Sequence, residues 1–84
     1  MEKITVYSTQ WCGDCRVAKR FLKEKGIAFT EIDIDKDEAA SRRIIEWSGG
    51  RRVIPTFLIE CSSSGRRIIL HDPSLSDLAK VFSP

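Results

Sequence analysis

The sequence has no long hydrophobic run, few cysteines and almost no excess of charge of either sign. Three cysteines, one histidine and one methionine occur in 84 residues, and 14 basic against 12 acidic side chains leave a formal net charge of +2. No segment is long and apolar enough to span a bilayer. The small and dispersed positive charge argues against partners such as nucleic acid or a membrane surface. The N-terminal segment shows no signal-peptide pattern, so we expect a cytoplasmic protein without a framework of structural disulfides.

The overall composition is that of a small soluble domain. Apolar residues make up 42% of the chain and charged residues 31%. A chain of this length forms one domain, residues 1–84, with a modest core, and we expect it to be a monomer.

The hydrophobic pattern predicts an α/β fold with the order β-α-β-α-β-β-α. Strands are expected near residues 3–8, 27–33, 53–59 and 67–70, and helices near residues 13–25, 35–48 and 74–82. Right-handed crossovers would make the first two strands parallel, and a hairpin loop at 62–65 would add antiparallel pairing. The result is a four-stranded mixed sheet with helices on both faces.

The predicted helices carry recognisable ends. Gly26 is expected to end the first helix in the left-handed conformation. Asp35, with Glu38 three residues later, resembles a capping box that begins the second. Ser74 with Asp77 is the corresponding pair for the third helix.

The most informative motif is Trp11-Cys12-Gly13-Asp14-Cys15, at the junction between the first strand and the first helix. Cys12 would lie at the helix N-terminus, where unpaired N–H groups and the helix dipole favour a thiolate. Cys15 follows one turn later, close enough to attack a mixed disulfide formed by Cys12. The alternative is a pair of ordinary reduced cysteines. Asp14 would either raise the Cys12 pKa by charge repulsion or point into solvent, and we favour the latter.

The element order, the C-x-x-C motif and a proline entering the third strand together resemble the glutaredoxin branch of the thioredoxin superfamily. The likeness is greatest to mycoredoxin-type and other short bacterial glutaredoxins. It rests on Tyr7 to Cys15, on Arg51 to Thr56 and on Asp72-Pro73-Ser74, and covers nearly the whole chain. Many glutaredoxins have Cys-Pro-Tyr-Cys and a lysine where this chain has Thr9. They also carry a glycine-rich glutathione-binding segment where this chain has residues 71–74.

This resemblance implies a thioredoxin-like (glutaredoxin) fold and a thiol–disulfide oxidoreductase that reduces mixed disulfides or protein disulfides. Cys12 would be the nucleophile and Cys15 the resolving thiol. No cofactor would be bound. A low-molecular-weight thiol, glutathione or mycothiol-like, would be co-substrate, or a thioredoxin-reductase-type flavoenzyme would supply electrons. Partners would be disulfide-bearing proteins.

The resemblance also implies a substrate-binding surface around Cys12. Trp11 would form a flat apolar wall, and the backbone of Ile54 would pair with the substrate beside a cis Pro55. The alternative is that Pro55 is an ordinary proline at a strand start. Arg51 and Arg52 would bind a substrate carboxylate or else form an unliganded basic loop. The helix start at Ser74 would receive a second carboxylate or serve only as a cap.

The sequence is compatible with two further functions. Glycine after the first cysteine permits an iron–sulfur cluster carrier of the glutaredoxin type.

The second is a zinc site, for which the chain has the residue types in Cys12, Cys15, Cys61 and His71. Their spacing is not the usual one for zinc, and we expect no metal. Cys61 is otherwise a bystander or an exposed thiol open to modification.

Overall fold

The computed structural model describes residues 2–82, and their elements follow the predicted order. Along the chain, these elements are β1 (Glu2–Ser8), α1 (Gly13–Glu24), β2 (Thr30–Asp33), α2 (Glu38–Trp47), β3 (Thr56–Cys61), β4 (Arg66–His71) and α3 (Leu75–Val81). None of the helices within this described range is long and apolar enough to cross a membrane.

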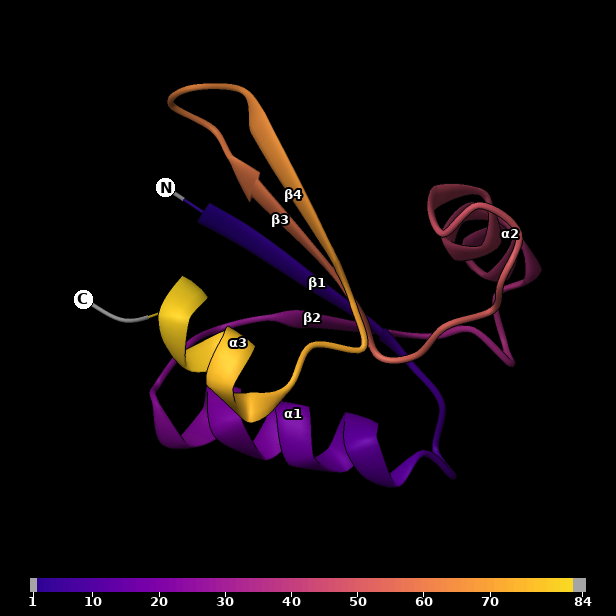
Figure 1. Cartoon of the computed structure of the whole chain (residues 1–84), viewed down its shortest axis with the longest axis horizontal. Coiled ribbons are helices and arrows are strands. Elements are labelled where there is room, and N and C mark those ends of the chain that lie inside the picture. The colour runs from indigo at the N-terminus through magenta and orange to yellow at the C-terminus, as the bar shows by residue number, and fades with distance from the viewer. Residues whose placement is uncertain (1, 83–84) are drawn as a thin grey trace.

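The strands form one mixed sheet in the order β2-β1-β3-β4. β1 pairs with β2 in parallel and with β3 in antiparallel orientation, and β3 and β4 form the predicted hairpin. Helices α1 and α3 lie side by side on one face of the sheet, and α2 covers the other (Figure 1). The four-stranded mixed sheet between two helical layers is therefore as predicted.

Alternation along the strands divides the core between the two faces of the sheet. One cluster packs under α1 and α3 and consists of Ile4, Val6, Ala18, Leu22, Phe57, Ile59 and Leu78. The other packs under α2 and consists of Tyr7, Ile34, Ala40, Ile44 and Leu58. Trp47 packs against the second cluster and meets the Tyr7 ring edge-on at a centroid distance of 5.7 Å. Both faces of β1 and β3 are covered by helices, so these strands are central to the core. The loop that follows β1 and the loop that precedes β3 therefore start from well-packed strand ends.

The first helix ends as predicted at Gly26, but the following strand begins later than predicted. Gly26 has φ +70°, and the N–H groups of Gly26 and Ile27 donate to the carbonyls of Lys23 and Leu22. This double hydrogen bond is a Schellman motif. It draws Ile27 back over the helix end, so β2 starts only at Thr30 rather than at Ile27.

The predicted cap of the second helix was wrong. Asp37, not Asp35, is the N-cap residue, and its side chain accepts a hydrogen bond from the Ala40 N–H at 3.0 Å. The side chain of Asp35 is engaged elsewhere, as described below. β3 also begins later than predicted, at Thr56, because the chain turns at Ile54 and Pro55 before pairing starts.

Candidate active site

Cys12 is the N-cap residue of α1 and lies directly after the loop that leaves β1. Its backbone is extended (φ −85°, ψ 114°), and its Sγ accepts a hydrogen bond from the Cys15 N–H at 3.1 Å. Only 8% of the residue is exposed. A sulfur in this position accepts from the otherwise unpaired N–H groups of the first turn and lies at the positive end of the helix dipole. Cys12 therefore lies at the N-terminus of α1, where the sequence predicted it.

Cys15 lies one turn further along α1 and is completely buried. Burial, followed by the hydrogen bond with Cys12 and the charge on that residue, raises the pKa of Cys15 from its ordinary value of 9.0 to about 12. A hydrogen bond with the Thr9 backbone acts in the opposite direction; its effect is smaller than that of burial or of the Cys12 hydrogen bond, but larger than that of the Cys12 charge. The two sulfurs are thus placed in unlike surroundings, one at a helix terminus and one in the protein interior.

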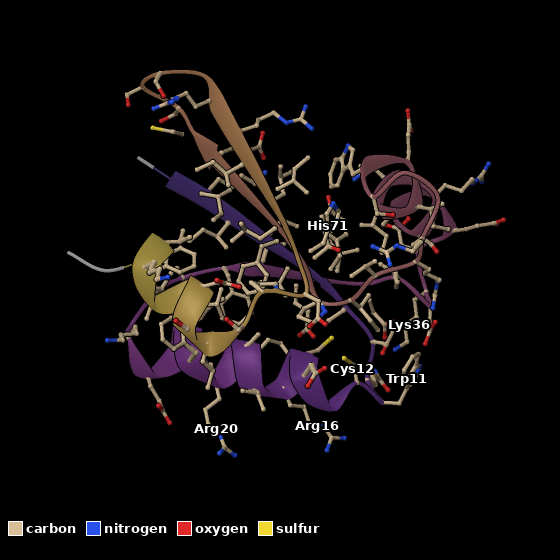
Figure 2. The ribbon with its side chains drawn as sticks, viewed as in Figure 1. Trp11, Cys12, Arg16, Arg20, Lys36 and His71 are labelled. Atoms are coloured by element: carbon tan, nitrogen blue, oxygen red, sulfur yellow. The ribbon has the colours of Figure 1, made fainter. Side chains whose placement is uncertain are left out.

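Trp11 stands beside Cys12 and is held by a relay of polar side chains. Its side chain is largely exposed, at 67% for the residue, and its indole Nε1–H donates to Asp35 at 2.8 Å. The other oxygen of Asp35 accepts from the Arg52 guanidinium at 2.8 Å, and Arg52 Nε donates to Ser41 at 3.1 Å. The hydrogen bonds from Arg52 and then from Trp11 lower the pKa of Asp35, which therefore stays charged. Figure 2 shows Trp11 at the outer edge of the loop beside Cys12.

Asp35 and Ser41 are site residues that the sequence analysis missed. A usable signal existed, because the carboxyl ends of neighbouring parallel strands meet at one edge of a sheet. β1 and β2 are such neighbours, Trp11 follows β1 and Asp35 follows β2. The order of strands in the sheet was needed to see this.

The two arginines predicted to bind a substrate carboxylate lie in different surroundings. Arg52 is engaged with Asp35 and Ser41. Arg51 is exposed, and its backbone N–H donates to the Ser48 hydroxyl at 2.9 Å. Arg51 thus extends from a loop that is anchored to the end of α2.

The Ile54–Pro55 peptide bond is cis, as the resemblance implied. Pro55 is buried, and its carbonyl accepts a hydrogen bond from the Asp72 N–H at 2.8 Å. The Thr56 hydroxyl donates to the Val53 carbonyl at 2.7 Å. The loop before β3 is therefore tied both to itself and to the loop that follows β4.

Ser74 caps α3 in the predicted capping box. Its hydroxyl accepts from the Asp77 N–H, and its own N–H donates to the Asp77 carboxylate, both at 3.1 Å. These bonds lower the pKa of Asp77. The N–H and the hydroxyl oxygen of Ser74 are therefore used within the helix end, and its binding of a second carboxylate stays a prediction.

The four residues of the conceivable zinc site do not converge. Cys61 is paired with Glu2 at the start of β1, the far end of that strand from Cys12 and Cys15. The ring Nδ1 of His71 lies 3.3 Å from the Thr56 hydroxyl, within hydrogen-bonding distance. Among residues 2–82, no three His, Cys, Asp or Glu side chains are grouped to hold a metal ion.

Comparisons of the sequence and of the fold with known proteins point to the same family and fold. The sequence matches the family model of glutaredoxin over residues 4–60. A candidate glutaredoxin of Mycobacterium tuberculosis is 40% identical over 53 residues, and the chain spans 63% of that relative. Mycoredoxin 1 of Corynebacterium glutamicum is 36% identical over 56 residues, which cover 67% of this chain and 68% of the relative. The crystal structure of the thioredoxin-like protein BC3987 superposes with a TM-score of 0.67 at 28% identity, covering 95% of this chain and 100% of that one. The fold is therefore thioredoxin-like.

Proposed function

This chain belongs to the glutaredoxin family of thiol–disulfide oxidoreductases, and from that premise we propose that it reduces mixed or protein disulfides through Cys12 and Cys15. The observation that carries the proposal is the hydrogen bond of 3.1 Å from the Cys15 N–H to the Cys12 sulfur. It combines a sulfur positioned to carry charge with a second, buried thiol one helical turn away.

In the proposed reaction, the Cys12 thiolate attacks one sulfur of the substrate disulfide. The S–S bond breaks, the other sulfur leaves as a thiolate that takes up a proton from solvent, and the substrate stays joined to Cys12 as a mixed disulfide. Cys15 then attacks the Cys12 sulfur, and the released substrate thiolate takes up the proton of Cys15. The substrate gains two electrons and the protein ends with a Cys12–Cys15 disulfide.

The environment of Cys15 suits the order of these two attacks. While Cys12 is free, its hydrogen bond and its charge help to keep Cys15 protonated. Once Cys12 is in a mixed disulfide, its negative charge is gone and Cys15 loses its proton more readily. The resolving thiol is thus restrained until there is an intermediate for it to attack.

The remaining parts of the proposal concern partners. We propose that a low-molecular-weight thiol, glutathione or mycothiol-like, or a thioredoxin-reductase-type flavoenzyme returns the protein to the dithiol form. The protein would act in the cytoplasm as a monomer of one domain, residues 1–84. Trp11, Arg51, Ile54 and Pro55 surround the proposed path of the substrate, with Arg52 acting through Asp35 on Trp11.

The test is turnover of a small mixed disulfide by the wild type and three cysteine variants, with glutathione and mycothiol in parallel. Cys12→Ser should be inactive, and Cys15→Ser should retain turnover only where the small thiol can resolve the intermediate itself. Cys61→Ser is the matched control and should behave as wild type, since Cys61 lies at the other end of the sheet. Full activity of Cys12→Ser would contradict the proposal.

A further inference from the structure

A groove of about 320 Å³ lies between α1 and α3, beside the first turn that carries the dithiol. Asp14, two residues after Cys12, is on its rim, and residues 72–75 form its opposite wall. In Figure 2, α3 and Trp11 lie on opposite sides of Cys12. The groove is therefore separate from the Trp11 relay, and a substrate that reaches Cys12 can lie along it.

The groove exposes apolar side chains of both helices that border it. Val17 is 48% exposed and Leu75 is 50% exposed, although both continue the apolar stripes of their helices. Pro73 lines the same groove, and the buried Leu78 forms part of its floor. An apolar side chain that covers Val17 and Leu75 would remove this surface from water, which favours binding.

Two carboxylates define the charge of the groove. Asp14 and Asp72 are both exposed, and none of the residues lining the groove is positively charged. Asp72 has φ +48°, and its N–H is fixed by the Pro55 carbonyl at 2.8 Å, so this acidic side chain is held next to the cis-proline loop. Arg16, on the same helix, donates instead to the Gln10 carbonyl and points away from the body of the protein (Figure 2).

We infer that this acidic groove binds an extended segment of a disulfide-bearing protein that carries a lysine or arginine and an apolar side chain next to its cysteine. The inference rests on the proposed function, because the groove is useful only if Cys12 attacks the bound segment. A small thiol that presents a carboxylate here would meet two like charges and leave the apolar walls uncovered. A basic, apolar peptide satisfies both features of the groove.

The test is a single turnover of the reduced protein with synthetic peptides, so that no external reductant enters. Every protein in the test also carries Cys61→Ser, because the partly exposed third thiol would otherwise release the coloured group itself. Each peptide is joined through its cysteine to thionitrobenzoate. Attack of Cys12 on the peptide sulfur breaks the S–S bond and releases coloured thionitrobenzoate. Cys15 then displaces the peptide thiol from Cys12. One peptide has Leu-Lys before its cysteine, a second has Leu-Glu, and the mixed disulfide of glutathione is the third substrate.

The wild type should react about tenfold faster with the Lys peptide than with the Glu peptide at low salt, and this ratio should shrink in about 1 M salt. In the double variant Asp14→Asn with Asp72→Asn, the ratio should fall to about one. Asparagine at position 72 also tolerates the left-handed conformation, so the loop is preserved. Because the readout is a ratio, any change in the reactivity of Cys12 itself cancels. Glu46→Gln, an exposed acid on α2, is the matched control and should keep the wild-type ratio.

The possible failures are distinguishable. If Cys12→Ser releases thionitrobenzoate as fast as wild type, the proposed function is wrong and the inference with it. If wild type reacts through Cys12 but at equal rates with both peptides, only the groove inference is overturned. A preference for the glutathione mixed disulfide that is unchanged in the double variant would likewise overturn it.

Discussion

The unequal surroundings of the Cys12 and Cys15 sulfurs predict that Cys15 is almost unreactive in the folded, reduced protein. Its pKa is raised from 9.0 to about 12. Each unit is a factor of ten in protonation equilibrium, so Cys15 holds about a thousandfold less thiolate at neutral pH than an unperturbed cysteine. Since only the thiolate is alkylated, its reaction with iodoacetamide at pH 7 should slow by at least that factor.

The assay is pulse labelling of the reduced protein with iodoacetamide, followed by mass spectrometry of the cysteine-containing peptides. The same protein unfolded in urea provides the reference rate for Cys15, because unfolding removes both its burial and the contact with Cys12. Labelling of Cys15 in the folded protein within about tenfold of that reference would refute the reasoning.

A second variant separates burial from the influence of Cys12. Cys12→Ala removes the hydrogen bond and the charge that raise the pKa of Cys15, but leaves its burial in place. Labelling of Cys15 should therefore become faster than in wild type while remaining slower than in urea. The substitution also removes the N-cap of α1, at a cost of about 1 kcal/mol, so circular dichroism should confirm that the variant is folded.

Three further predictions concern residues outside the dithiol. Hydrogen bonds from the side chains of the serine loop lower the pKa of Cys61 to about 7, so its alkylation rate should rise with pH to a midpoint near 7; a midpoint near 9 would contradict this. Phe57→Ala should lower the free energy of unfolding in urea by about 3–5 kcal/mol, since Phe57 is fully buried in the core under α1 and α3; a loss under about 1 kcal/mol would contradict its role. Asp35→Ala should move the indole N–H signal of Trp11 in an NMR spectrum, whereas Lys36→Ala, an exposed neighbour, should leave it in place.

Local signals in the sequence were sufficient for the dithiol and most of the fold. The strand, the C-x-x-C motif and the helix are consecutive, so the place of Cys12 at the helix N-terminus follows from short-range pattern alone. The cis bond before Pro55 was predicted only through the family resemblance, because an isolated X-Pro bond is usually trans.

Long-range contacts decided what the sequence could not predict. Asp35 and Asp37 are both suitable helix caps, and the choice between them depends on Trp11 and Arg52, which lie 24 and 17 residues away from Asp35. Val17 fits the apolar stripe of α1, yet it is half exposed because α3 covers only part of that stripe. In both cases the local pattern is satisfied, but tertiary contacts decide whether the residue acts as the helix cap or is buried in the core.

The register of β1 against β3 also places Cys61 far from Cys12 and Cys15. Tyr7 pairs with Thr56 at the dithiol end, and Glu2 pairs with Cys61 at the other. The five residue steps of extended strand from Glu2 to Tyr7 span about 17 Å, whereas a disulfide needs Cα atoms within about 7 Å. Without unfolding, Cys61 cannot form an intramolecular disulfide with Cys12 or Cys15. Cys61 can thus be oxidised, capped or cross-linked to another molecule without entering the proposed redox cycle of Cys12 and Cys15.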